Sequence, residues 1–150
     1  MNSRHPNLLA SDEELAAVAR DVRVAAVVGM KDDARAWEPA FEIPKMMIER
    51  GIEVIPVNPT IPSSLGRASH ARLADVPVAF DLVDVFRRSD RIPGLVVEIL
   101  ALPAERRPAV VWLQSGIRND AAALRLAEAG IRVVQDACLG VFAARVRPRA

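Results

Sequence analysis

Two strongly apolar runs of the sequence are each followed by cationic side chains, and a glycine lies near the end of the first run. The run that contains Gly29 is followed by Lys31 and Arg35, and the run AFDLVDVF is followed by Arg87. Glycine lets a phosphate approach the backbone, and lysine and arginine bind phosphate oxygens through charge-assisted hydrogen bonds. The two segments therefore indicate a ligand with several phosphates. Each residue also has an ordinary explanation, as a strand-ending glycine or a solvated surface cation.

Turn-forming residues follow two further apolar runs. Asn58 and Pro59 follow IEVIPV, and Gln114 and Gly116 follow PAVVWL. Backbone and amide groups in such turns can orient a ligand. Phe86 ends its own run and can offer a ring face to adenine, although an aromatic residue at such a position is also typical of the core. These turns supply the second group of candidate ligand contacts.

The pattern differs from that of nicotinamide-dinucleotide sites. The next glycine after Gly29 is Gly51, so the glycine-rich fingerprint of those sites is absent. Dinucleotide-binding enzymes also place an acidic residue at the end of the second strand, where this chain has Val57, Asn58 and Pro59. Both absences argue against an NAD(P)-binding oxidoreductase or redox-sensing domain. That class of protein is kept as the alternative interpretation.

Few residues have the types that catalysis or metal binding requires. The two histidines are His5, which is expected in a frayed terminus, and His70, which is expected in a loop with no acidic partner apparent in the sequence. No triad and no metal site is therefore predicted. Cys138 is the single cysteine and follows the last apolar run. Both a reactive thiol and a small semi-buried residue are compatible with its position. We expect no catalytic residue in this chain.

The candidate residues come directly after segments with the pattern of buried strands. Apolar runs without polar alternation are typical of strands covered on both faces. Five strands are predicted, over 22–30, 52–59, 79–86, 108–114 and 131–135. Helices are predicted over 12–20, 41–51, 91–102 and 121–130. This alternation predicts an α/β fold with a doubly wound, mostly parallel, five-stranded Rossmann-like sheet and helices on both faces, and ligands bind at the carboxyl ends of such strands.

Capping residues and prolines set the expected helix boundaries. Ser11 with Glu14 three residues later forms a capping box for the first helix. Pro44 is compatible with the second helix only in its first turn. Ser89 or Asp90 is expected to cap the third helix and Asn119 the fourth.

The composition narrows the class of protein. A chain of 150 residues fits one domain, and 51% apolar residues with only 4% aromatic residues suit a core of Val, Ile, Leu and Ala. Twenty Lys and Arg balance 19 Asp and Glu, so no nucleic-acid partner is expected. No apolar run has the length of a membrane span, and the first residues lack the apolar core of a signal peptide. No membrane partner is therefore expected. A single cysteine is typical of a reducing compartment, so the chain is expected to be cytoplasmic.

Six segments, taken in order, resemble the bacterial CoA-binding protein family. They are VAAVVGM at 24–30, EVIPVNP at 53–59, LADVP at 73–77, LVDVFRRSD at 82–90, VVWLQSGIRN at 110–119 and AGIRVVQDAC at 129–138. That family is similar in turn to the N-terminal domain of the succinyl-CoA synthetase alpha subunit. The resemblance implies a Rossmann-like domain that holds coenzyme A across the strand ends. The cofactor-binding residues that it implies are Gly29, Lys31, Arg35, Asn58, Pro59, Phe86, Arg87, Gln114 and Gly116.

The resemblance also implies a function and a division of the chain. The expected function is non-catalytic binding of coenzyme A or an acyl-CoA, in a carrier, sensor or partner-presenting role. A homo-oligomer or an acyl-CoA enzyme is the expected protein partner. The expected units are a helical extension at 1–20, a CoA-binding Rossmann-like domain at 21–140 and a C-terminal tail at 141–150. The chain departs from the family in a longer first loop at 30–42 and in Ala40, where the family has a serine.

Overall fold

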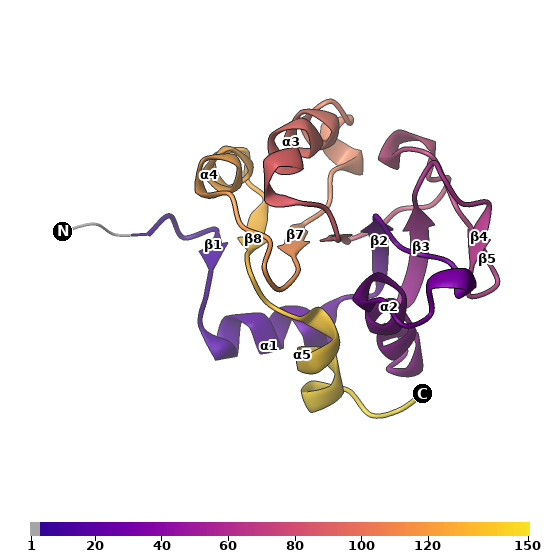
Figure 1. Cartoon of the computed structure of the whole chain (residues 1–150). Coiled ribbons are helices and arrows are strands. Elements are labelled where there is room, and N and C mark those ends of the chain that lie inside the picture. The colour runs from indigo at the N-terminus through magenta and orange to yellow at the C-terminus, as the bar shows by residue number, and fades with distance from the viewer. Residues whose placement is uncertain (1–3) are drawn as a thin grey trace.

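A six-stranded sheet forms the centre of the molecule in the computed structural model, which describes residues 4–150 (Figure 1). The strand order is β1-β8-β7-β6-β2-β3, and every pairing in this sheet is parallel. The strands are β1 (Leu8–Leu9), β2 (Val24–Val28), β3 (Glu53–Val57), β6 (Leu82–Val85), β7 (Val110–Leu113) and β8 (Arg132–Val134). The predicted α/β class is confirmed, and the five predicted strands are β2, β3, β6, β7 and β8.

Helices cover both faces of the sheet, as expected for a doubly wound fold. Helices α1 (Asp12–Asp21), α2 (Pro39–Glu49) and α5 (Leu139–Val146) pack together on one face, and α3 (Ile92–Leu100) and α4 (Asp120–Glu128) pack together on the other (Figure 1). A separate antiparallel hairpin, β4 (Ser63–Ser64) with β5 (Arg67–Ala68), lies beside β3. Within residues 4–150, no helix is long and apolar enough to cross a bilayer.

Strand β2 is buried on both faces of the sheet, which explains why its sequence does not alternate between apolar and polar residues. Ala25 and Val27 belong to the hydrophobic cluster under α1, α2 and α5, whereas Ala26 and Val28 belong to the cluster under α3 and α4. All four are at most 1% exposed. Because successive side chains of a strand point to opposite faces, a strand covered on both faces favours apolar residues on each of them.

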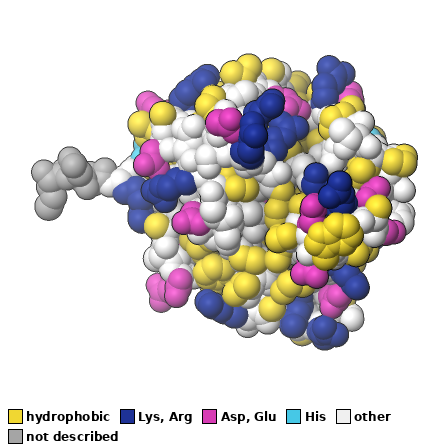
Figure 2. All heavy atoms as spheres, in the orientation of Figure 1, with side chains coloured by type: hydrophobic (Ala, Val, Ile, Leu, Met, Phe, Trp, Pro, Cys, Tyr) yellow, Lys and Arg dark blue, Asp and Glu magenta, His cyan; other side chains and the backbone are white. Residues whose placement is uncertain are grey.

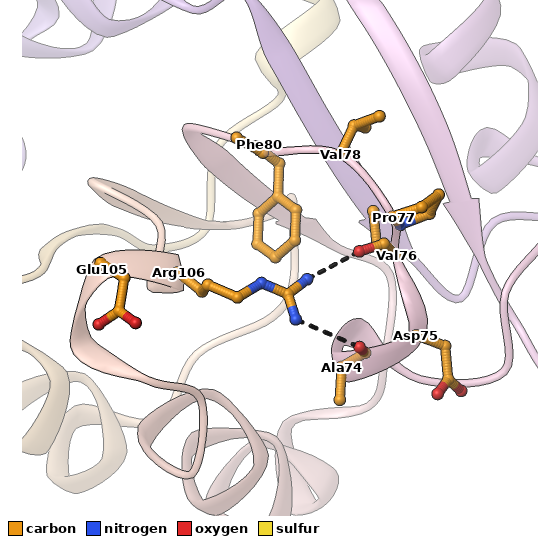
Figure 3. Close-up of a pocket in the computed structure, with 9 residues that line it drawn as sticks. Ala74, Asp75, Val76, Pro77, Val78, Phe80, Glu105 and Arg106 are labelled. Atoms are coloured by element: carbon orange, nitrogen blue, oxygen red, sulfur yellow. Dashed lines mark hydrogen bonds between the residues drawn. The ribbon is translucent and has the colours of Figure 1, made fainter.

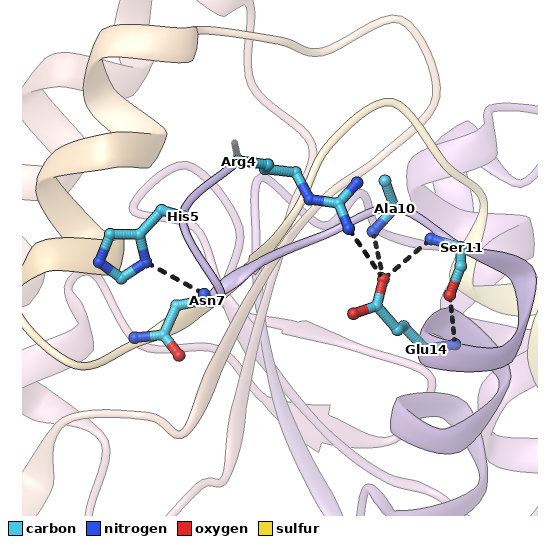
Figure 4. A network of polar contacts seen from close by, with 6 residues as sticks. All are labelled: Arg4, His5, Asn7, Ala10, Ser11 and Glu14. Carbon is cyan, nitrogen blue, oxygen red and sulfur yellow. Dashed lines mark hydrogen bonds and ion pairs between the residues drawn. The ribbon is translucent and has the colours of Figure 1, made fainter. Parts of the chain in front are cut away.

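The sixth strand comes from the N-terminal segment, which the sequence analysis assigned to a helical extension. Leu8 and Leu9 of β1 pair in parallel with Val133 and Val134 of β8. Figure 4 shows the contacts around this segment: the Asn7 N–H donates to His5 Nδ1, and Glu14 accepts from the Ala10 and Ser11 N–H groups. The predicted capping box between Ser11 and Glu14 is confirmed. A two-residue strand is too short to produce a recognisable pattern of its own.

Most of the predicted C-terminal tail is helical. Helix α5 buries Leu139, Phe142 and Ala143, and the rings of Phe142 and Trp112 pack edge to face with 6.0 Å between their centroids. This helix was not predicted from the sequence. Its eight residues include Gly140, which lowers helix propensity, so the local signal is weak and packing decides the outcome.

Candidate functional site

The predicted site residues all lie in segments that follow strands at the carboxyl edge, which we define as the carboxyl ends of β2, β3, β6, β7 and β8. From β2 the chain passes through α2 to β3 on one side, then returns across β2 to β6 on the other side. The strand order therefore reverses between β2 and β6. Ligands of open α/β sheets bind at such a switch point.

Gly29 and Phe86 meet at this switch point. The Gly29 N–H donates to the carbonyl of Val57 at 2.9 Å, and the Phe86 N–H donates to the carbonyl of Val28 at 2.9 Å. Gly29 has a φ of +81°, and a Cβ atom there would overlap the carbonyl oxygen of Phe86. Glycine is required here because two strand ends approach each other closely and the backbone is left-handed.

The first loop carries Lys31 and Arg35, and the structure gives them different surroundings. The Lys31 carbonyl accepts from Ser64 Oγ at 2.7 Å, which ties the loop to the β4–β5 hairpin. The Lys31 side chain makes no ion pair within residues 4–150. Arg35 lies 3.5 Å from Glu38, and its guanidinium is 5.9 Å from the ring centre of Trp37, a side chain that is 68% exposed. The positive charge of Lys31 is therefore less compensated by neighbouring groups than the charge of Arg35.

Pro44 anchors this loop from inside α2. The expectation that Pro44 lies in the first turn is wrong, because α2 begins at Pro39. Proline has no N–H, so the carbonyl of Ala40, four residues earlier, receives no helical hydrogen bond from Pro44. The N–H of Lys31 donates to that carbonyl at 3.1 Å. A proline within a helix thus frees an acceptor that holds the first loop.

Asn58 ties the ends of β2 and β3 together. Its Nδ2 donates to the Met30 carbonyl at 2.9 Å, and its Oδ1 accepts from the Thr60 N–H at 2.9 Å and the Thr60 hydroxyl at 2.7 Å. Asn58 is 8% exposed, whereas Pro59 is exposed. Both polar atoms of the Asn58 side chain are therefore engaged within the protein.

An open groove follows β6 and contains two of the predicted residues. It measures about 580 Å³. We call it the arginine groove, and its lining residues are Phe86, Arg87, Arg88, Arg91, Gly94 and Leu95. Arg88 and Arg91 were not predicted as site residues from the sequence. The signal was present in the tract FRRSDR, which places three arginines within five positions directly after a buried strand.

Ser89 links the loops that follow β6 and β7. The expectation that Ser89 or Asp90 caps the third helix is wrong, because α3 begins after Arg91, whose side chain makes no capping bond. The Ser89 hydroxyl instead accepts from the Arg118 N–H at 3.0 Å. The Asn119 cap of α4 is confirmed, since its side chain accepts from the Ala122 N–H.

A buried carboxyl group, Asp84, lies beneath the carboxyl edge and was not singled out by the sequence analysis. Asp84 is fully buried in β6, in register with Val27 and Trp112. Gln114 Nε2 donates to its Oδ1, and its Oδ2 has no partner within residues 4–150. Burial raises the pKa of Asp84 to about 7, against the lowering effect of the bond from Gln114. The sequence signal that could have identified Asp84 is an acidic residue within an otherwise apolar strand.

The structure places Gln114 and Gly116 in different environments. Gln114 is 3% exposed and engaged with Asp84, whereas Gly116 is exposed, with a φ of +83°. The Gly116 N–H donates to Asp136 Oδ1 at 2.6 Å, which links the β7 and β8 ends. Of these two predicted contacts, Gly116 is the accessible one.

The histidines and the cysteine lie outside the arginine groove. His5 lies near β1, and the His70 backbone pairs with Pro56 and Asn58 of the β3 segment. Cys138 precedes α5 and is half-buried beside a separate hollow of about 470 Å³. In residues 4–150, no three His, Cys, Asp or Glu side chains are grouped as metal ligands would be.

Another hollow lies away from the carboxyl edge. It measures about 330 Å³ and is lined by residues that precede β6 and β7 (Figure 3). Arg106 crosses it and donates to the carbonyl of Val76 at 2.7 Å and to that of Ala74 at 3.4 Å. Because this guanidinium is engaged with backbone carbonyls, it holds the segment before β6 in place.

On the face that Figure 2 shows, basic and acidic side chains are interspersed.

Comparisons with known proteins give one matching family and several similar proteins. The profile of the family described as "CoA binding domain" matches residues 23–144. The uncharacterized protein YneT of Bacillus subtilis (strain 168) is 36% identical over 131 residues, 87% of this chain and 93% of YneT. The solved structure of cell-free ID.343 from Thermus thermophilus is 36% identical, with a TM-score of 0.80, over 91% of this chain and 99% of that one. A hypothetical protein from Pyrococcus horikoshii OT3 is 27% identical, with a TM-score of 0.77, over 97% and 98%.

Proposed function

Because this chain belongs to the CoA-binding domain family, we propose that it binds coenzyme A or an acyl-CoA at the carboxyl edge without catalysing a reaction. The observation that carries the proposal is the position of the arginine groove directly beside the Gly29 turn, where the strand order reverses. Cations at a switch point suit a ligand with several phosphates.

The predicted site residues divide into two roles in this proposal. Lys31 and Arg87 are available to a ligand, and we assign them to direct contact. Gly116 is exposed, but its N–H is engaged with Asp136, so only its carbonyl is left for a ligand. Asn58 and Gln114 have their side chains engaged within the protein, so we assign them to positioning the loops. Arg35 contributes only if its ion pair with Glu38 opens.

The non-catalytic part of the proposal rests on the chemistry of the groove. Its lining residues are phenylalanine, arginines, glycine and leucine, and none of these is an ordinary nucleophile or general base at neutral pH. The groove is therefore suited to holding an anion and offers no group to attack one. Carriage, sensing and presentation of acyl-CoA would all use such a site.

A thermal-shift series on nucleotide-free protein tests the proposal, with CoA, acetyl-CoA, NAD and NADP as ligands. A ligand at a hundred times its dissociation constant stabilises the folded state by about 2.7 kcal/mol, which raises the Tm by several degrees. We expect CoA and acetyl-CoA to stabilise the protein. Stabilisation by NAD or NADP without stabilisation by CoA would overturn the proposal in favour of the nicotinamide alternative.

A further inference from the structure

The positive charge of the arginine groove is largely uncompensated. Arg87 is half-buried and Arg91 is exposed, and neither makes an ion pair within residues 4–150. Arg88 pairs with Asp90 at 3.3 Å, but the two side chains are 74% and 67% exposed. An exposed ion pair of this kind is weak. A multiply charged anion can therefore compete for all three guanidinium groups.

The groove also has open space and apolar surface beside its arginines. Phe86 is half-buried and adds apolar surface to the groove, whereas Leu95 is only 1% exposed. A Cβ atom at Gly94 would meet no other atom within 4 Å, so the backbone there is open. Three arginines along one open groove favour an anion with several acceptor oxygens.

Coenzyme A carries its most concentrated charge on a phosphate monoester. Its pyrophosphate has one negative charge on each phosphorus, whereas a phosphate monoester carries about −1.5 to −2 at pH 7 on three acceptor oxygens. Building on the proposed function, we infer that the arginine groove binds the 3′-phosphate of coenzyme A. The groove then selects CoA over dephospho-CoA, which differs only in lacking that phosphate.

Isothermal titration calorimetry with CoA and dephospho-CoA tests the inference in the wild type and in Arg87→Ala, Arg91→Ala and Arg125→Ala. Arg125 is exposed on α4, outside the groove, and serves as the matched control. The wild type should prefer CoA by about tenfold to a hundredfold, as expected for charge-assisted hydrogen bonds. Arg87→Ala should lose most of that preference, with its affinity for dephospho-CoA nearly unchanged, and Arg125→Ala should behave as the wild type.

The other outcomes separate this inference from the proposed function. Equal affinity of the wild type for the two ligands would overturn the inference and leave CoA binding intact. Equal weakening of both ligands by Arg87→Ala and Arg91→Ala would place the pyrophosphate in the groove and also overturn it. Binding of neither ligand to the wild type would overturn the proposed function itself. If Arg87→Ala does not fold, Arg91→Ala and Arg87→Lys supply the same comparison.

Discussion

Gly29 and Phe86 are in backbone contact at the point where the strand order of the sheet reverses. The contact leaves no space for a side chain at Gly29, because a Cβ atom would overlap the carbonyl oxygen of Phe86. It also places the Gly29 turn against the residue that begins the arginine groove. Two parts of the proposed site, distant in the sequence, are thus held in fixed relation by the sheet itself.

Gly29→Ala should destabilise the protein more than an alanine at another left-handed glycine. Gly66 is the matched control, because its φ of +75° resembles the +81° of Gly29 but a Cβ atom there would meet nothing within 4 Å. Gly66→Ala should cost about 1–2 kcal/mol for the left-handed backbone alone. Gly29→Ala should cost at least about 2 kcal/mol more, because the strand ends must separate. Urea unfolding of both variants measures the difference, and equal losses would contradict the close approach.

Asp84 should make the stability fall as the pH rises from about 4 to 7. The pKa of its carboxyl is raised from 3.8 to about 7 in the folded protein, so over this interval the unfolded chain releases a proton that the folded chain retains. Asp84→Asn removes this titration. The unfolding free energy of the variant relative to wild type should therefore rise by on the order of 4 kcal/mol between pH 4 and pH 8. A constant difference across this range would show that Asp84 does not hold its proton.

Arg147 should contribute strongly to stability although it lies close to the end of the chain. Its guanidinium donates to the Arg20 and Val22 carbonyls at the end of α1, and to the Arg50 carbonyl at the end of α2. The last carbonyls of a helix lack partners within it, and a cation there also interacts favourably with the helix dipole. Arg147→Ala should cost about 2–4 kcal/mol.

Arg149→Ala is the control for Arg147. Arg149 makes one ion pair with Glu49 at 3.0 Å, and its side chain is 72% exposed. Removal of such a surface pair should cost less than about 1 kcal/mol. Similar losses for Arg147→Ala and Arg149→Ala, measured by thermal unfolding, would contradict the capping role of Arg147.

Trp37 should report whether the first loop takes part in ligand binding. The chain has two tryptophans, and Trp112 is fully buried with its Nε1 donating to the Ala137 carbonyl at 2.9 Å. Acrylamide should therefore quench mainly Trp37, and Trp37→Phe should remove most of the quenchable emission. If Lys31 contacts the ligand, CoA should change the quenching of the wild type. An unchanged quenching curve at saturating CoA would remove the first loop from the site.

The sequence predicted the regular part of the fold because the signals there are local. Apolar β-branched runs located β2, β3, β6, β7 and β8, and the Asn119 cap located the start of α4. Elements that lack a strong local signal were missed. These are β1 with its two residues, the β4–β5 hairpin and helix α5, which form only because the rest of the fold supplies a surface for them.

The sequence by itself determined that the chain folds as a parallel α/β sheet and which residues follow its strands. Side-chain periodicity and the types of the turn residues carry that information along the chain. Only the tertiary structure decided the roles of those residues: that Gly29 faces a carbonyl, that Asn58 and Gln114 bind their own protein, and that Asp84 is buried. These roles depend on contacts between segments distant in the sequence. Such contacts leave no periodic trace in either segment alone, because each follows from the register and order of the strands.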